Sequence, residues 1–386
     1  MKILITYPFG LGGVCQTELR QLRFSPMRKW YALMLQNVQR EDVYRINLWS
    51  RIANKVFVVL AEQKVMDFDA LFDLVGSLDW KQYIGLGHGV RVLAHSRDSQ
   101  LASTRTIQSI VHKSILTQLT GSREKHWETD DSKSVIEISV DIYKDMATIM
   151  INTSGVSLHE RGYRTEQGDA PLKENIAAGL LLLAGWDKKS PLYDPFCGSG
   201  TICIEAAMMV AGIAPWSLRT FAFEDFVSFD GLVWDWLRQS ATLKRPGSFA
   251  SAQDDIRIFG SDIDVSVLEK AQANASRAGV EDMVDFQEKH FLDQSFEFRG
   301  QSLDKKIWCV TNPPYGVRIK PQDTSYKLQD DLSVDGNSHE LVEDLVSVFE
   351  NSDLFGWFLL LRWLQTPWFS CIDLLNGQQE VCFYKK

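Results

Sequence analysis

The sequence lacks a hydrophobic run long enough to cross a membrane. Its longest apolar stretch, residues 176–186, has eleven residues, whereas a membrane-spanning helix needs about 20. The apolar start of the chain has no small-residue cleavage site, so we predict a first β-strand there rather than a signal peptide. We therefore expect a cytoplasmic protein with no membrane partner.

Cysteine is scarce and shows no metal-binding pattern. The six cysteines include no C-x-x-C pair and no histidine cluster accompanies them, which argues against a disulfide framework and against a metal site. Reduced thiols are expected, and Cys197 and Cys203 are predicted to be buried small residues. Proline and glycine, 11 and 25 residues of 386, are too few for a low-complexity chain, so two or three globular domains are expected.

An excess of positive charge is missing from the chain as a whole, which has a net charge of −9. The charge is unevenly distributed, because residues 1–165 carry a net charge of +4 and residues 166–386 one of −13. The N-terminal part is thus better suited to bind a polyanion, although charge placement matters more than such totals.

Two patterns of predicted elements follow one another. The first is an α+β module with strands at 3–6, 55–60, 90–95, 135–140 and 147–151 and helices near 15–22 and 107–115. The second has strands at 192–196, 256–261, 284–287, 307–311 and 357–361 and helices at 175–184, 202–210, 268–278 and 340–349. Regular alternation of strand and helix predicts an α/β domain with a doubly wound parallel sheet.

A glycine-rich loop follows the first strand of this sheet. The segment Asp194-Pro-Phe-Cys-Gly-Ser-Gly-Thr201 leads from strand to helix, and its glycines let the backbone turn tightly and approach a ligand closely. Asp194 can bind an ammonium or ribose group. The loop has no Gly-Lys-Ser/Thr, which excludes a triphosphate-binding loop. Taken alone, an ordinary strand-to-helix turn explains it equally well.

Acidic residues end the second strand, in Gly260-Ser-Asp262-Ile263-Asp264. An acid at this place binds ribose hydroxyls in nucleoside-cofactor folds, so Asp262 is the candidate ribose ligand and Ile263 a candidate contact for adenine. Capping of the following helix is the alternative for both acids, and it is the favoured reading for Asp264.

The segment Asn312-Pro313-Pro314-Tyr315 follows the strand at 307–311. Ligands of open α/β sheets bind at the carboxyl ends of the strands. The Asn312 side-chain oxygen and the Pro313 carbonyl can accept both hydrogens of a base amine, which holds its nitrogen in line with a methyl donor. Tyr315 can stack on the base. A rigid turn is the weaker alternative.

Together these motifs resemble class I S-adenosylmethionine-dependent methyltransferases that methylate amines. More narrowly, the chain resembles the THUMP-domain ribosomal RNA guanine-N2 methyltransferases, in the form that stops after one methyltransferase domain. The narrower resemblance rests on segments spread over most of the chain, and it is thin over residues 1–100. These segments are Asn152–Arg164, Ala170–Glu174, Asp194–Thr201, Ile204–Ala207, Phe221–Glu224, Asn312–Gly316 and Leu375–Gly377.

The resemblance implies a Rossmann-like catalytic domain behind a ferredoxin-like and THUMP module that docks RNA. The implied regions are 1–60 (ferredoxin-like), 61–155 (THUMP), 156–190 (linker and leading helix) and 191–386 (class I methyltransferase). The implied activity transfers methyl from S-adenosylmethionine to the N2 amine of a guanine in 23S ribosomal RNA, as naked RNA or an assembly intermediate, without metal. The implied cofactor-binding residues are Asp194, Phe196, Gly198, Ser199, Gly200, Thr201, Asp262, Ile263, His290, Phe291 and Lys173.

The sequence departs from the family pattern at two places. Asn152 stands where Asp is expected, and His290 stands where an acid usually faces the adenine amine. A neutral imidazole accepts that hydrogen bond but a protonated one does not, so cofactor affinity is expected to be weaker or pH-dependent.

Several side chains keep two readings. Lys173 meets the cofactor carboxylate or is a solvated lysine. Arg161 and Arg164 contact phosphate or the cofactor tail, or are surface arginines. The aromatic residues after the first helix of the α/β domain form an RNA stacking platform or, the favoured reading, a local core; they are Trp216, Phe221, Phe223, Phe226, Phe229, Trp234 and Trp236.

Other functions remain open at this point. Adenine-N6 methylation of DNA and glutamine methylation of release factors use the same tetrapeptide, but the N-terminal module argues against both. A tRNA guanine-N2 methyltransferase and a non-catalytic RNA-binding ribosome-assembly factor are the stronger alternatives.

Overall fold

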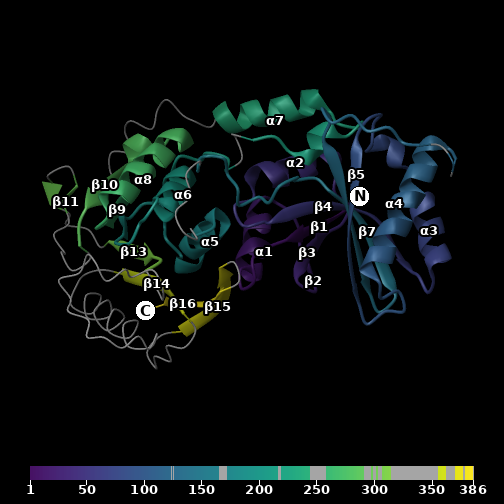
Figure 1. Cartoon of the computed structure of the whole chain (residues 1–386). Coiled ribbons are helices and arrows are strands. Elements are labelled where there is room, and N and C mark those ends of the chain that lie inside the picture. Colours follow the sequence, from purple (N-terminus) through teal and green to yellow (C-terminus); the bar gives the residue numbers. More distant parts are fainter. Residues whose placement is uncertain are drawn as a thin grey trace. The chain divides into compact units, whose positions relative to one another are not determined.

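The computed structural model describes two compact units. It covers residues 1–122, 124, 126–164, 172–215, 219–243, 258–290, 297–298, 301–302, 307–313, 355–361, 370–376 and 379–385. The first unit comprises residues 1–7, 15–158 and 216–240, and the second comprises residues 8–14, 159–215 and 241–386. Each unit is built on a seven-stranded sheet (Figure 1).

The first unit has one continuous sheet with the strand order β2-β3-β1-β4-β7-β6-β5. Only β5 and β6 are parallel neighbours. The strands are β1 (Lys2–Thr6), β2 (Met27–Lys29), β3 (Ala32–Leu35), β4 (Lys55–Lys64), β5 (Gly89–Arg97), β6 (Val135–Tyr143) and β7 (Met146–Asn152), and the helices are α1 (Gly12–Gln21), α2 (Arg40–Trp49), α3 (Phe68–Gly76) and α4 (Thr104–Thr120).

Strand β4 joins the two parts of this unit. It pairs with β1 at its start and with β7 along most of its length, with a bulge between Val59 and Ala61. The expected boundary between residues 60 and 61 therefore falls inside one strand. The sheet is covered on both faces in β1, β3, β4 and β7, where consecutive residues are buried, and one buried cluster consists of Leu4, Ala32, Met34, Phe57, Val59 and Met150. In β6 only alternate residues are buried, namely Ile136, Ile138, Val140 and Ile142. Ile107, Val111 and Ile115 of α4 are buried, as the helical spacing predicts.

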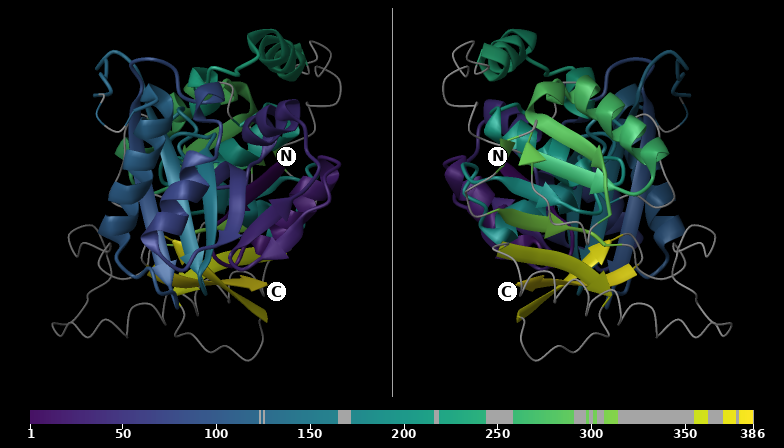
Figure 2. Two further views of the ribbon diagram at one scale, coloured as in Figure 1. Left: turned by 90° about the vertical axis from the view of Figure 1, so that its right-hand side faces the viewer. Right: turned by 90° about the vertical axis from the view of Figure 1, so that its left-hand side faces the viewer.

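The second unit has the strand order β10-β9-β8-β13-β14-β16-β15. The pairs from β10 to β14 are parallel, and β16 and β15 add an antiparallel edge. Figure 2 (right) shows this hairpin, in yellow, and the green strands of the opposite edge. The strands are β8 (Leu192–Asp194), β9 (Ile258–Asp262), β10 (Val284–Glu288), β13 (Trp308–Thr311), β14 (Phe355–Leu361), β15 (Ser370–Asn376) and β16 (Gln379–Lys385). In the described part of this unit the α-helices are α5 (Glu174–Ala184), α6 (Thr201–Val210) and α8 (Val265–Ala278), with a small pair of strands β11 (Glu297–Phe298) and β12 (Gln301–Ser302).

This order confirms the predicted doubly wound α/β sheet. The chain runs outward from β8 through β9 to β10, and it then returns to the other side of β8 with β13 and β14. The carboxyl ends of β8 and β13 thus mark the point where the strand order reverses, which is where ligands of such sheets bind. The predicted helix at 340–349, with Asp169 and Pro171, lies outside the described residues.

Two short segments pack in a different unit from the residues next to them in the sequence. Residues 216–240 follow α6, yet they pack in the first unit. They contain a 3-10 turn (Ala222–Asp225) and most of α7 (Gly231–Leu243). Residues 8–14 follow β1, yet they pack in the second unit, where Leu11 lies against Gly179 of α5. The expected catalytic region 191–386 therefore contains a segment of the first unit.

No helix in the part of the chain that the structure describes has the length and apolar character to cross a bilayer.

Candidate active site at the carboxyl ends of β8, β9 and β13

Three predicted site residues lie at neighbouring strand ends. Asp194 is the last residue of β8, Asp262 the last of β9, and Asn312 directly follows β13. Because β9, β8 and β13 are parallel neighbours, their carboxyl ends meet at one edge of the sheet. Motifs separated by more than a hundred residues in the sequence are brought together in this way.

The glycine-rich loop is held by the end of β9. Gly198 has a φ of +50° and donates its N–H to Asp262 Oδ2 at 3.1 Å. A side chain at Gly198 would meet nothing within 4 Å, so the loop has free space on this side. Gly200 has a φ of +81°, and a Cβ there would lie 2.8 Å from the ring of Phe286. Only glycine satisfies both demands at Gly200.

Asp194 is buried and connects β8 to β13. Its Oδ1 accepts hydrogen bonds from Thr311 Oγ1 at 2.6 Å and from the Phe196 N–H at 3.2 Å. Burial raises the pKa of this carboxyl to about 7. The geometry gives Asp194 the task of holding Thr311, the residue before Asn312. Its direct contact with a ligand, expected from the sequence, stays a prediction.

The two acids after β9 have different partners. Asp262 accepts from the Gly198 and Asp264 N–H groups and is half-buried, and desolvation raises the pKa of its carboxyl. Asp264 is the N-cap of α8 and accepts from the Ser266 N–H at 2.9 Å, which confirms the capping reading. Ile263 between them is 56% exposed, so its apolar side chain is available to a ligand.

The side-chain oxygen of Asn312 is the atom of the site that most clearly points to a ligand. Its Oδ1 is buried and has no hydrogen-bond partner among the described residues. A buried acceptor without a partner costs free energy unless a ligand or water supplies the donor. Pro313 is buried beside it. Pro314 and Tyr315 lie outside the described residues, as does Phe291.

The start of α5 adjoins the start of α6. The Arg164 guanidinium donates to the Leu172 carbonyl at 2.9 Å and to Thr201 Oγ1 at 3.2 Å. Lys173, the N-cap of α5, is therefore placed near the glycine-rich loop with a half-buried side chain. Arg164 also forms an ion pair with Glu174 at 3.1 Å.

Both sequence-based readings of Arg161 are wrong. The Arg161 guanidinium and the Glu205 carboxylate of α6 are fully buried and form a two-pronged ion pair, with Nε–Oε1 at 2.9 Å and Nη2–Oε2 at 3.3 Å. Arg164 is likewise a buried ion-pair partner and not a surface residue. A buried arginine needs a fully paired partner, and Glu205 lies 44 residues further along the chain, beyond any local pattern.

Ser199 and His290 lie at the edge of the candidate site. The Ser199 carbonyl accepts from the Asn274 Nδ2 of α8 at 3.1 Å, which ties the loop to that helix. His290, two residues past β10, is exposed. Its position agrees with the expected side of the site, and its role stays a prediction.

The thiols of Cys197 and Cys203 are not suited to act as nucleophiles. Cys197 and Cys203 are buried and unbonded to other cysteines, and burial raises the pKa of both thiols well above the usual value. They are structural residues, as expected. Within the described ranges no group of three or more His, Cys, Asp and Glu side chains could hold a metal ion.

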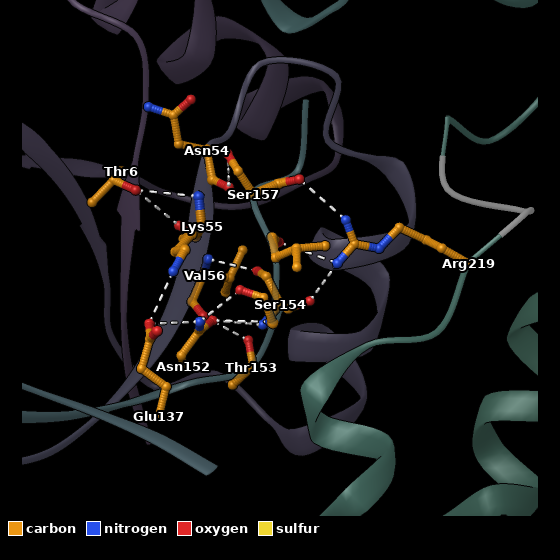
Figure 3. Close-up of polar contacts among 12 residues, drawn as sticks. Thr6, Asn54, Lys55, Val56, Glu137, Asn152, Thr153, Ser154, Ser157 and Arg219 are labelled. Carbon is orange, nitrogen blue, oxygen red and sulfur yellow. Dashed lines mark hydrogen bonds and ion pairs between the residues drawn. The ribbon is translucent and has the colours of Figure 1, made fainter. Parts of the chain in front are cut away.

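A polar network that the sequence did not reveal closes the end of β7 (Figure 3). The Arg219 guanidinium donates to the carbonyls of Ser154 at 2.8 Å, Val156 at 3.1 Å and Ser157 at 3.1 Å. On the other side of this turn, the Asn152 Nδ2 donates to Glu137 Oε1 at 2.9 Å, which also pairs with Lys55. One arginine of segment 216–240 thus satisfies three backbone acceptors in the first unit.

The aromatic residues of this segment form a local core rather than a platform. Phe221, Phe223, Phe226 and Trp234 are at most 8% exposed. The Phe223 ring stacks on Tyr44 of α2 with centroids 4.4 Å apart. Trp236 is the exception, with 65% exposure, and Trp216 lies outside the described residues.

Comparison with known proteins agrees with this geometry. The chain matches the family models described as "RlmL ferredoxin-like domain" over residues 2–57, "THUMP domain" over 65–152 and "RMKL-like, methyltransferase domain" over 161–354. The crystal structure of SMU.472, complexed with SAH, is 30% identical and has a TM-score of 0.81, covering 100% of this chain and 97% of that one. The fold is therefore that of a class I methyltransferase preceded by a ferredoxin-like and THUMP module.

Two named relatives show which family the chain belongs to. The chain is 33% identical to "Putative RNA methyltransferase YpsC" of Bacillus subtilis (strain 168), over 82% of this chain and 80% of that protein. It is 30% identical to Ribosomal RNA large subunit methyltransferase K/L of Psychromonas ingrahamii, over 97% of this chain but 47% of that protein. The chain thus spans about half the length of the K/L relative. It belongs to the family with the RMKL-like methyltransferase domain.

Proposed function

We propose that this chain transfers a methyl group from S-adenosylmethionine to the exocyclic N2 amine of a guanine in 23S ribosomal RNA. The observation that carries the proposal is the buried Oδ1 of Asn312 at the end of β13, which has no hydrogen-bond partner among the residues that the structure describes. A base amine has two hydrogens to donate and needs such an acceptor. The sulfonium of the cofactor supplies an activated methyl group, so the chain's own residues have mainly to bind and orient.

The residues around the glycine-rich loop fit the cofactor. Gly198 leaves open space beside the backbone, and Asp262 is only half-buried and can accept from ribose hydroxyls while it holds the loop. Exposed Ile263 offers an apolar surface to the adenine ring. Lys173, His290 and Phe291 are proposed for the carboxylate and the adenine side of the same ligand. The crystal structure of SMU.472 with SAH supports this assignment.

The Asn312 loop is proposed to hold the acceptor amine. The lone pair of an exocyclic amine is delocalised into the base, which makes it a poor nucleophile. When the Asn312 Oδ1 and the Pro313 carbonyl each accept one amine hydrogen, the nitrogen is drawn toward tetrahedral geometry and its lone pair can point at the methyl carbon. Tyr315 is proposed to stack on the base, which must leave its helix to reach this loop.

The substrate class is proposed from the N-terminal module and the relatives. A THUMP domain model matches residues 65–152, and residues 1–165 carry a net charge of +4 against −13 for the rest. The K/L relative is named for the large ribosomal subunit RNA. We also propose the four regions 1–60, 61–155, 156–190 and 191–386, with residues 216–240 as an insertion that packs in the first unit.

Single-turnover methyl transfer to unmodified large-subunit RNA tests the proposal, with S-adenosylmethionine titrated by calorimetry alongside. Asn312→Ala should lower the single-turnover rate about a hundredfold or more, because the lost oxygen acts on the attacking nitrogen. Cofactor affinity should stay near the wild-type value. Tyr315→Ala should mainly weaken RNA capture, while Tyr315→Phe should be mild.

The outcomes separate the alternative functions. An Asn312→Ala protein with a near-normal rate would leave the loop as a rigid turn. A wild-type protein that binds no S-adenosylmethionine would point to a non-catalytic assembly factor. Mass spectrometry of ribosomal and transfer RNA from a deletion strain identifies the modified molecule, and loss of a methylguanine from tRNA alone would replace 23S RNA as the substrate.

A further inference from the structure

Three turns of the first unit bring aromatic and basic side chains together outside the site described above. Lys29 ends β2 and Trp30 begins the β2–β3 turn, Arg97 ends β5, and Tyr143 ends β6 with Lys144 following it in the β6–β7 turn. We call these five residues the tip cluster. The strand order separates β3 from β6 by three strands, so this contact between turns is a long-range feature of the sheet.

The tip cluster is held by ring contacts. The Trp30 and Tyr143 rings meet edge to face with centroids 5.4 Å apart. The Arg97 guanidinium lies 4.7 Å from the centre of the Tyr143 ring, and the Lys29 ammonium lies 5.0 Å from that of Trp30. The Lys144 ammonium lies 5.2 Å from the Tyr143 ring. Each ring is therefore within cation–π range of a positive charge.

These side chains lie on the surface. Trp30 is 45% exposed and the Arg97 side chain 63%. Tyr143 pairs with Arg97 across β5 and β6, and its neighbour Ile142 is the residue that points into the core. The cluster thus lies on the face of the sheet opposite to the buried residues of β6.

The backbone at Trp30 indicates that the ring itself matters. Only Trp30 and Tyr31 separate the paired residues Lys29 and Ala32, and Trp30 has a φ of +53°. In a two-residue hairpin turn this first position favours glycine, and a bulky side chain with positive φ strains the backbone. Local folding alone therefore gives no reason for tryptophan here.

The nearby acids each face a cation of the cluster. Glu62 pairs with both Lys2 and Lys29, Asp98 lies 3.9 Å from Arg97, and the half-buried Asp141 is close enough to Arg97 and Lys29 to interact with their charges. The exposed Lys144 has no carboxylate partner among the described residues. An exposed Trp30 ring beside the half-buried Tyr143 ring, with the exposed cations Arg97 and Lys144 next to them, suits a ligand that has flat aromatic groups and negative charges in alternation, which describes an unpaired nucleic-acid strand.

We propose that the tip cluster binds an unpaired segment of the RNA substrate, with a base stacked on Trp30 and phosphates held by Arg97 and Lys144. This inference rests on the proposed function for the choice of RNA. A folded protein partner offers no comparable alternation of ring faces and anionic charge, so it is an outcome of the test rather than a second proposal.

The test measures binding of a fluorescent single-stranded RNA of about 12 nucleotides, which lies within the usual footprint of about 4–16 nucleotides, to the full chain. Trp30→Gly should weaken binding about five- to hundredfold, because one base-stacking contact is lost. Glycine accepts the positive φ, so the thermal midpoint should not fall. Trp30→Phe should retain most of the affinity. Trp236→Ala, at the other exposed tryptophan of the same unit, is the matched control and should bind as the wild type does.

Salt dependence distinguishes stacking from charge. Arg97→Ala and Lys144→Ala should each lower the slope of log affinity against log salt by about 0.7, as expected for one phosphate contact on a single strand. Trp30→Gly should leave the slope unchanged. A duplex of the same sequence should compete poorly.

Several results would overturn the inference. These are wild-type affinity in Trp30→Gly, an equal loss in Trp236→Ala, equal competition by duplex RNA, and absence of single-strand binding by the wild-type chain. Failure of the proposed function looks different, since it appears as absence of methyl transfer by the wild type. An Asn312→Ala protein that binds the oligonucleotide normally but does not methylate keeps the two questions apart.

Discussion

At the scale of single residues, the two acids at the end of β9 have different structural roles. Asp262 holds the glycine-rich loop, and Asp264 caps α8. Asp262 accepts from the Gly198 N–H and so determines the shape of the glycine-rich loop. Asp264 accepts only from the first turn of α8 in this region. The same residue type two positions apart therefore holds the glycine-rich loop in one case and caps a helix in the other.

Substitution of each acid should have a different result. Asp262→Ala should weaken S-adenosylmethionine binding by about 1–3 kcal/mol, because the ribose hydroxyls and the Gly198 N–H lose their acceptor. Asp264→Ala is the matched control and should lower stability by about 1 kcal/mol through loss of a helix cap, with little change in cofactor affinity. Calorimetric titration and urea denaturation measure the two quantities. Equal cofactor affinity in both variants would refute the assignment of Asp262.

Asp194 should make stability depend on pH. Its pKa in the folded state is about 7, above the unfolded value of about 3.9, so the folded state binds the extra proton. The stabilisation is complete below the unfolded pKa and is lost as pH rises through about 7. Asp194→Asn, which can still accept from Thr311, should flatten the decrease in unfolding free energy between about pH 4 and pH 7, at about 1.4 kcal/mol per pKa unit removed.

The buried Glu174 carboxyl makes a second pH-dependent contribution to stability, which remains when Asp194 is replaced. Burial raises its pKa to about 7 as well, so the Asp194→Asn protein should keep a weaker pH dependence that arises from Glu174. Parallel stability curves for wild type and Asp194→Asn would show that Asp194 is ionised in the fold. Urea denaturation at several pH values provides the measurement.

The hydrogen bonds of Asn152, the last residue of β7, explain why asparagine stands where aspartate is expected from the family pattern. The Asn152 Nδ2 donates to Glu137 and to the Gly155 carbonyl, while its Oδ1 accepts from the Ser154 N–H. An aspartate has no hydrogen to donate and would place a second negative charge beside Glu137. In this chain, asparagine is the residue that fits next to Glu137.

At the scale of elements, α6 is held by the segment before α5. Arg161 pairs with Glu205 in the second turn of α6, and Arg164 reaches Thr201 at its start. The Arg277 Nε of α8 donates to the Tyr163 carbonyl at 2.7 Å. Residues 161–164 therefore connect α6 and α8, the two helices that follow β8 and β9.

Removing one member of the buried pair should be worse than removing both. Arg161→Met leaves the Glu205 carboxylate buried without its partner, which should cost about 3–5 kcal/mol of stability. The double variant Arg161→Met with Glu205→Leu should recover much of this loss, because no charge remains in the core. Chemical denaturation of the single and double variants measures the coupling. Additive losses would mean that the two side chains act independently.

The elements also show what a sequence can and cannot reveal. The strands β8, β9, β10, β13 and β14 and the helices α6 and α8 were predicted because their periodicity is local, and Gly279 ends α8 as expected. The positions of Asp194, Asp262 and Asn312 at strand ends follow from the same patterns. The burial of Arg161 and the contact of Trp30 with Tyr143 depend on partners 44 and more than 100 residues away. The short hairpin β2–β3 and helices α2 and α3 were missed, although the buried Leu71, Leu74 and Val75 of α3 follow helical spacing.

At the scale of the whole molecule, the two units do not correspond to two continuous halves of the chain. Segment 216–240 lies within the range of the methyltransferase family model, yet its aromatic residues surround Tyr44 of the first unit. Unit membership therefore cannot be read from family boundaries.

Phe223→Ala should destabilise the first unit. Loss of a buried phenylalanine costs about 3–5 kcal/mol, and its ring packs on Tyr44 of α2. Hydrogen exchange should therefore quicken in α2 first, although residue 223 follows α6 in the chain. Trp236→Ala on the exposed side of α7 is the control and should change stability by less than about 0.5 kcal/mol. Faster exchange confined to α6 and α8 would contradict this packing.

The displaced segment has a consequence for the growing chain on the ribosome. The first unit lacks part of its core until residue 240 has been made, roughly 80 residues after its own strands are complete. At about 5–20 residues per second, translation leaves Tyr44 without its aromatic partners for roughly 4–16 s. The nascent protein therefore cannot finish its N-terminal part first and then its catalytic part. Its folding order is interleaved, and chaperones have a defined interval in which to bind the unfilled side of α2.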